Sequence, residues 1–182
     1  MDRRGANFFD VCKQVREKLG ANPVPLQVPI GSEDNFRGVV DLITGEAIVW
    51  DDETKGAEYK VIPIPAELQD TVDEYREKLM EVAAEYDDAI LEKYFEDPDT
   101  ITEEEVLIAL KGAVTDMKII PMMCGSAFKN KGVQTMLDRV CAFLPAPTDV
   151  EAIEGTNPDT GEIELRKPDA TAPFAALVFK IT

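Results

Sequence analysis

The spacing of apolar residues changes at Pro65, and this change restricts the fold of the 182-residue chain more than any other feature. Before Pro65, short apolar segments alternate with turn-forming residues, which predicts a small and mainly antiparallel sheet. These segments are 26–30, 38–43, 47–50 and 59–62. After Pro65, apolar residues recur three and four positions apart from Leu68 to Tyr86, which predicts a long amphipathic helix. A sheet followed by helices indicates an α+β unit.

Further helices are predicted on both sides of this unit. A first helix at 6–19 ends at Gly20, and a second short helix follows Asp87-Asp88. Thr102 with Glu105 forms a capping-box pattern that opens a helix reaching about Val114. Residues 118–124 are predicted to form a strand and 131–143 a helix, while 145–173 resembles a linker with a hairpin near 157–161.

Composition excludes several kinds of site. The chain has 19 basic and 36 acidic residues and a net charge of −17, which disfavours nucleic-acid binding and favours basic protein partners. No histidine is present, so Ser–His and Cys–His catalysis and every His-containing metal site are excluded. No carboxylate pair has a setting that suggests acid–base catalysis. We expect no catalytic residue and no metal site.

Three further expectations concern particular residues. Cys12, Cys124 and Cys141 form no C-x-x-C pair, so we expect buried free thiols. No apolar segment approaches the ~18 residues of a membrane helix and no signal-peptide core begins the chain, so we expect a cytoplasmic protein without membrane contact. Phe36 and Trp50 are expected in the core of the sheet, and Asp41 on the solvent side of an alternating strand.

The segment 119–134 is the sharpest local motif, with an apolar strand, a Gly-Ser-Ala turn and a helix. Such a turn points backbone N–H groups outward, where they can contact acceptor atoms of a ligand. Taken alone, Ser126-Ala127 also fits an ordinary connection between a strand and a helix. Asp2 precedes the first helix, and a carboxylate can accept from two adjacent donors. The order of elements along the chain matches a GTPase half-domain: an acidic residue, a helix, a long insertion, a strand and this turn.

Segments 1–9, 19–27, 38–42, 124–134 and 173–177 together resemble the bacterial elongation factor G family, in register from the first residue to the last. The resemblance implies an α/β fold: part of a P-loop GTPase domain with an inserted α+β subdomain. It assigns 1–22 and 118–144 to the C-terminal part of the GTPase domain and 23–117 to the insertion. It also assigns 145–172 to a linker and 173–182 to the first strand of a following β-barrel, so that the chain is expected to be an internal fragment.

The resemblance also implies functional residues. Asp2 would accept from guanine N1–H and N2–H₂, while the turn at Ser126, Ala127 and Phe128 would donate a backbone N–H to guanine O6. GTP or GDP would be the cofactor of the parent protein, and its partners the ribosome and the C-terminal domain of the ribosomal stalk protein. Exposed acids three and four apart on the long helix are the candidate stalk contacts, namely Glu74, Glu77, Glu81 and Glu85. A simply solvated helix face is the alternative.

Several elements of the family pattern are missing from the sequence. No Asn-Lys precedes Met1-Asp2, no G-x-x-x-x-G-K-[ST] phosphate loop is present, and both switch regions are missing. We therefore expect no GTP hydrolysis and no tight nucleotide binding by this chain alone, although the parent hydrolyses GTP. Three alternatives remain open: an acidic adaptor without enzymatic activity, a release-factor or ribosome-protection relative, and a paralogue specialised for ribosome recycling.

Overall fold

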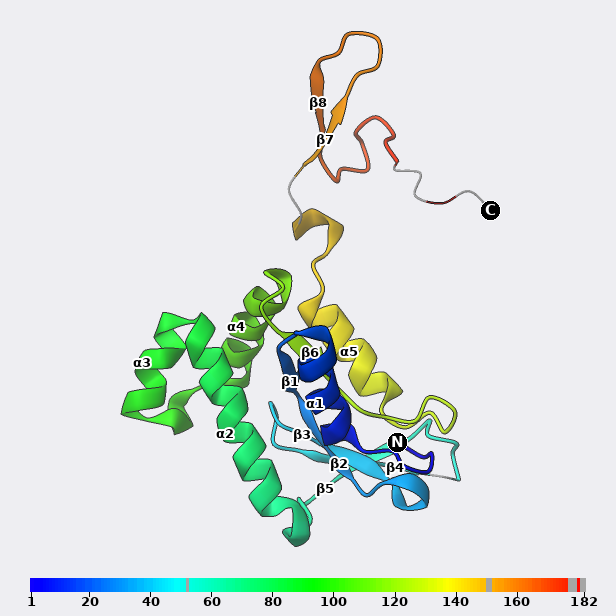
Figure 1. Ribbon diagram of the computed structural model, residues 1–182, viewed down its shortest axis with the longest axis vertical. Helices are drawn as coiled ribbons and strands as arrows, with labels where there is room; N and C mark the ends of the chain where they lie inside the picture. The colour runs from blue at the N-terminus through cyan, green and yellow to red at the C-terminus, as the bar shows by residue number, and fades with distance from the viewer. Residues whose placement is uncertain (52, 150–151, 177–179, 181–182) are drawn as a thin grey trace. The chain divides into compact units, whose positions relative to one another are not determined.

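The computed structural model describes residues 1–51, 53–149, 152–176 and 180. The chain divides into two compact units, Met1–Leu144 and Pro145–Thr182 (Figure 1). Within the described residues, four 3₁₀ helices lie between the main elements, at Glu33–Asn35, Ala66–Leu68, Pro98–Thr100 and Pro147–Asp149. None of the helices within the described residues is long and apolar enough to cross a membrane.

The first unit begins with helix α1 (Phe8–Leu19). The Asn7 side chain caps it by accepting from the N–H groups of Phe9 and Asp10, and Gly20 ends it with a φ of 64°. Both the predicted helix and its predicted end are therefore confirmed. Strand β1 (Pro23–Pro25) follows and pairs in parallel with β6 (Ile120–Met122). Strand β1 was not predicted.

A four-stranded antiparallel sheet comes next, in the order β2 (Gln27–Ile30), β3 (Gly38–Asp41), β4 (Ala47–Trp50) and β5 (Tyr59–Ile62). All four strands were predicted, and β4 and β5 have the predicted bounds. The sheet is antiparallel throughout because each strand pairs with its neighbour in sequence.

Three helices follow the sheet and cluster on one side of the unit (Figure 1). They are α2 (Gln69–Tyr86), α3 (Asp88–Glu96) and α4 (Glu103–Thr115). The predicted capping box is present, because the Thr102 side chain accepts from the Glu105 N–H and the Glu105 carboxylate accepts from the Thr102 N–H. Apolar residues of β2, β3, α2 and α4 form the main core, among them Val40, Leu79 and Leu110.

The opposite face of the sheet is also covered. Phe36, Val39, Ile48 and Trp50 form a second buried cluster there, which confirms the core positions expected for Phe36 and Trp50. Every residue of β3 is buried as a result. A strand with both faces covered does not alternate between core and solvent.

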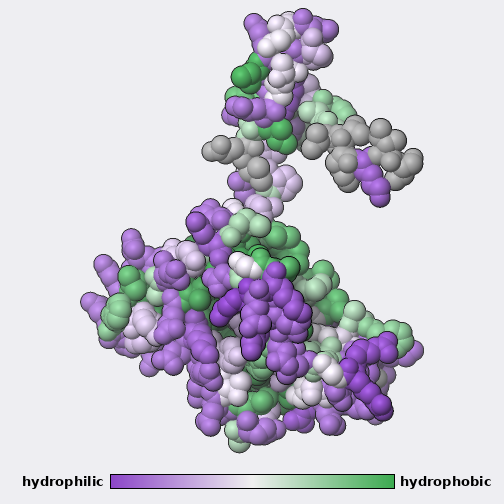
Figure 2. Space-filling view, viewed as in Figure 1, coloured by the Kyte–Doolittle hydropathy of each residue, from purple (hydrophilic) through white to green (hydrophobic). Residues whose placement is uncertain are grey.

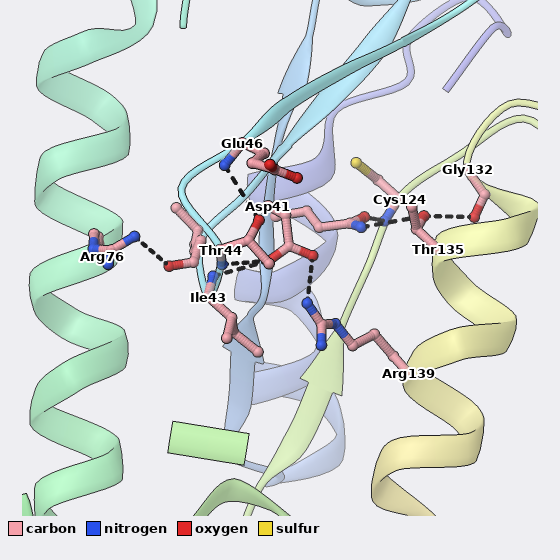
Figure 3. A network of polar contacts seen from close by, with 11 residues as sticks. Asp41, Ile43, Thr44, Glu46, Arg76, Cys124, Gly132, Thr135 and Arg139 are labelled. Atoms are coloured by element: carbon pink, nitrogen blue, oxygen red, sulfur yellow. Dashed lines mark hydrogen bonds and ion pairs between the residues drawn. The ribbon is translucent and has the colours of Figure 1, made fainter. Parts of the chain in front are cut away.

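The expected solvent position of Asp41 is therefore wrong. Its side chain is only 4% exposed and accepts from Arg139 of helix α5 (Val133–Phe143) at 2.8 Å. The same carboxylate accepts from the N–H groups of Ile43 and Thr44 at 2.9 and 3.2 Å. Figure 3 shows Arg139 approaching this turn from α5 while Arg76, from α2, donates to the carbonyl of Leu42 on the other side.

In the second unit, β7 (Ile153–Thr156) and β8 (Ile163–Arg166) form a hairpin. Its turn is closed by backbone hydrogen bonds from Asn157 N to Glu162 O and from Gly161 N to Asn157 O, so the predicted hairpin is confirmed. The predicted strand at 173–182 lies partly outside the described residues, and 173–176 are not in a strand.

Candidate functional site

Asp2 and Ser126 lie together in the folded chain although they are far apart in the sequence. The Ser126 hydroxyl hydrogen-bonds to the Asp2 carboxylate, and this bond, more than any other contact, lowers the pKa of Asp2 from its ordinary value. Ser126 is buried, whereas Asp2 is partly exposed. The carboxylate is thus ionised at neutral pH and accessible to a ligand.

The turn after β6 is fixed by its own backbone. Ser126 and Lys131 form an isolated antiparallel bridge, with N···O distances of 2.8 and 3.0 Å. The Ser126 hydroxyl oxygen also accepts from Lys129 N at 3.3 Å, and Asn130 adopts a φ of 54°. This bonding leaves the tip of the turn, Ala127 and Phe128, projecting from the surface.

Ala127 and Phe128 are both exposed, and the Phe128 side chain is 91% exposed. Within the described part of the chain, nothing accepts a hydrogen bond from the backbone N–H of either residue. The site therefore offers a carboxylate acceptor and two free N–H donors from one rigid turn. This arrangement complements a ring edge that carries donors beside an acceptor, as guanine does.

Several residues that no sequence motif indicated support this turn from behind. The Lys131 side chain is 2% exposed and donates to the carbonyl of Phe36 at 3.3 Å. The carbonyl of Gly56 accepts from Asn130 Nδ2 and from Gln134 Nε2, at 3.2 and 3.0 Å. The sequence Lys129-Asn130-Lys131 is typical of a polar, solvent-exposed loop. Only the structure distinguishes the buried Lys131 from Lys129.

The cysteines differ from one another in accessibility. Cys12 is buried, and burial raises the pKa of its thiol. Burial also raises the pKa of Cys124 to about 12. Cys141 is exposed, so the expectation of buried thiols is wrong for this residue, which lies on the outer side of α5. No group of three or more Cys, Asp and Glu side chains suited to a metal ion occurs among the described residues.

The four candidate partner contacts all lie on the exposed face of α2. Figure 2 shows hydrophilic surface over this helix. Glu74 forms an ion pair with Lys78, whose ammonium also lies 4.8 Å from the centre of the Tyr75 ring. Glu77, Glu81 and Glu85 form no ion pair with any residue that the structure describes. Three uncompensated carboxylates thus share one stripe of the helix.

A groove of about 610 Å³ lies between α1, β1 and α2, next to this stripe. The stacked rings of Phe9 and Tyr75, whose centroids are 4.6 Å apart, line it together with charged residues of both signs, namely Lys13, Arg16, Glu17, Lys78 and Glu81. The acidic stripe is therefore adjacent to apolar surface.

This chain is similar to known proteins in both sequence and structure. It is 60% identical over 181 residues to elongation factor G from Amoebophilus asiaticus and from Cytophaga hutchinsonii, and 48% identical to that from Karelsulcia muelleri. Each alignment covers 100% of this chain and 26% of the relative. From end to end, the chain is homologous to part of elongation factor G. The resemblance stated from the sequence motifs is confirmed.

The chain spans about a quarter of the length of these elongation factor G relatives. No protein-family model matches it. A crystal structure of a protein from Thermus thermophilus has the same fold, with a TM-score of 0.68 and 23% identity over 89% of this chain and 26% of that one. The predicted α/β fold class is confirmed by this similarity and by the mixture of helices and strands.

Proposed function

We propose that this chain is part of a ribosomal translocase GTPase of the elongation factor G type, which promotes the movement of tRNA and mRNA during translation elongation. Identity of 60% over the whole chain supports this assignment. The alternative of an acidic adaptor is not favoured, because elongation factor G sequences account for every part of the chain. A translation factor of this kind acts in the cytoplasm, with the ribosome as its partner.

The domain assignment is part of the proposal. Residues 1–22 and 118–144 form the C-terminal part of the GTPase domain, and 23–117 form an inserted subdomain. Residues 145–172 link this domain to a β-barrel that begins at 173–182. The sheet β2–β5 and the helices α2–α4 all fall between the two GTPase segments in sequence, which supports an insertion.

The carrying observation is the contact between Asp2 and Ser126. The Asp2 carboxylate accepts from guanine N1–H and N2–H₂, while the backbone N–H of Ala127 or Phe128 donates to guanine O6. Adenine presents an amino group in place of O6, so a donor would face a donor and one of them would stay unsatisfied. Selectivity for GTP and GDP over adenine nucleotides follows from this pattern of donors and acceptors.

The test uses the full-length protein that contains this segment, with the substitution Asp2→Asn. An asparagine amide presents a donor where guanine needs an acceptor, so affinity for GDP falls at least tenfold and affinity for xanthosine diphosphate rises. Asp138→Asn, an exposed acid of α5, is the matched control and leaves both affinities unchanged. Unchanged GDP affinity in the Asp2 variant contradicts the assignment.

The chain alone is proposed not to hydrolyse GTP and not to bind GTP or GDP tightly. Its 182 residues contain no phosphate-binding loop, and phosphate and Mg²⁺ contacts supply most of the binding energy in such enzymes. Isothermal titration of the isolated chain with GDP is expected to give no heat of binding. A dissociation constant in the low micromolar range would overturn this proposal.

The acidic stripe on α2 is proposed to bind the C-terminal domain of the ribosomal stalk protein. Carboxylates without an ion-pair partner among the described residues, beside a groove that the Phe9 and Tyr75 rings line in part, suit a partner surface that carries lysines near an apolar patch. Titration of the isotope-labelled chain with that domain should shift amide signals of α2 in a salt-sensitive manner. Unchanged signals in a folded sample would show that the helix face is only solvated.

A further inference from the structure

Lys131 has an unusual position for a lysine in a polar loop. Its backbone N–H and carbonyl both hydrogen-bond to the backbone of Ser126. Its side chain points inward, and the residue is 2% exposed. Among its contacts, Nζ donates to the carbonyl of Phe36, at 3.3 Å. Phe36 precedes β3 and is 1% exposed in the second core cluster. The side chain of Lys131 thus connects the turn to the sheet β2–β5.

A buried ammonium group is costly unless hydrogen bonds satisfy it, so this contact constrains the geometry of the turn. Lys129, two residues earlier, has no such role: it is half-exposed, and no hydrogen bond or ion pair of its side chain occurs within the described chain. The two lysines of one motif therefore differ in burial and in side-chain contacts.

A second contact holds the turn against the loop between β4 and β5. Gly56 has a φ of 73°, and a Cβ atom at this position would lie 2.5 Å from the carbonyl oxygen of Asn130 and 2.6 Å from that of Lys129. The two backbones thus touch directly. Trp50 Nε1 donates to Gln134 at 3.1 Å beside this contact, and Gln134 donates to Gly56. Both anchors belong to the sheet β2–β5 or its loops.

We infer that Lys131 is a positioning residue for base selectivity: by holding the turn on the sheet at Phe36, it aims the backbone N–H groups of Ala127 and Phe128 at the acceptor on carbon 6 of the purine. This inference rests on the proposed function, since it concerns the same site. Selectivity for guanine would then depend on the Lys131 side chain, which does not itself contact the nucleotide.

The test compares GDP with 6-thio-GDP, whose sulfur is a weak acceptor in place of O6, in the full-length protein. The ratio of their affinities measures the hydrogen bond to O6. Lys131→Met removes the donor at similar volume, and the ratio is expected to fall roughly five- to tenfold. Lys129→Met is the matched control and keeps the ratio of the unsubstituted protein.

Gly56→Ala provides a second variant. Its added Cβ displaces the turn through the carbonyls of Lys129 and Asn130, while the Lys131 side chain stays unchanged. This variant is expected to lower the same ratio, and it decides the question if Lys131→Met does not fold. Unchanged ratios in folded variants overturn the role of Lys131. An unsubstituted protein that does not distinguish GDP from 6-thio-GDP contradicts the guanine-reading site itself, which is a separate result.

Discussion

Acidic side chains occupy two contrasting regions of the first unit. Asp41 lies between the sheet and α5, 4% exposed, with Arg139 and two backbone N–H groups around it. Glu74 lies on the outer face of α2, 58% exposed, with the neighbouring Lys78 as its ion-pair partner. Buried carboxylates of the first kind determine how elements are held together, because they cannot remain uncompensated. Exposed carboxylates of the second kind contribute little to stability and remain available to a partner.

The largest effect is expected from Arg139→Met, which leaves the buried Asp41 carboxylate without its cation. We expect the free energy of unfolding of the chain to fall by about 3–5 kcal/mol, as measured by urea denaturation. Adding Asp41→Asn should restore much of the loss, because asparagine is neutral and its amide oxygen can still accept from Ile43 and Thr44. A loss below about 1 kcal/mol for the single variant would show that the Asp41–Arg139 pair contributes no more to stability than an exposed ion pair.

A smaller effect is expected at the start of α4. Thr102→Ala removes the hydroxyl that accepts from Glu105 N at 3.3 Å, and the loss of an N-cap costs about 1 kcal/mol. Thr115→Ala in the last turn of α4, where the hydroxyl donates to Lys111 O, is the control and should cost less. Equal losses in urea denaturation would show that the capping box does not contribute specifically.

Glu105 lies between the two extremes, since its side chain is 35% exposed. Hydrogen bonds from Lys93 and from Thr102 lower its pKa from 4.5 to about 2. A lowered pKa means that folding favours the ionised carboxylate, so its stabilising effect is complete above pH 4.5 and is lost as the pH falls toward 2. Urea midpoints measured across this range should depend less on pH in Glu105→Gln. An identical pH dependence in both proteins would contradict this assignment.

The smallest effect on stability is expected on α2. Replacing Glu77, Glu81 and Glu85 by glutamine should change the free energy of unfolding by less than about 0.5 kcal/mol per site. The same variant should bind a basic partner domain more weakly, and the difference should shrink as salt is added. Glutamine at Glu46, Glu58 and Glu162, three exposed acids away from the groove, gives the same change in net charge and is the control. Equal weakening by both variants would indicate net charge rather than a defined surface.

Much of the secondary structure could be predicted because local chemistry determines it. Thr102 and Glu105 mark the start of α4, and Gly20 marks the end of α1, where a left-handed φ of 64° suits a residue without a Cβ. Strand β1 could not be predicted in this way. It has three residues with proline at both ends, and its partner, β6, lies far along the chain.

Side-chain environments were harder to predict than elements. The position of Asp41 depends on what covers the second face of β3, and Arg139, which contacts its carboxylate there, lies 98 residues further along the chain. The meeting of Asp2 with Ser126 was anticipated only through the family resemblance. Lys131 was missed because its neighbours in sequence are polar, whereas its neighbours in space include the backbone of Phe36.

The parallel pairing of β1 with β6 has a consequence for how the chain can vary. Pro25 lies opposite Met122, so the long segment between them begins and ends at adjacent points of one two-stranded ladder. The entropic free-energy cost of closing such a segment grows only with the logarithm of its length, by about 0.6 kcal/mol for each doubling. Extra residues in the exposed loops of this segment therefore add little to the cost of closing the ladder, provided that its packed strands and helices are kept and its ends stay paired.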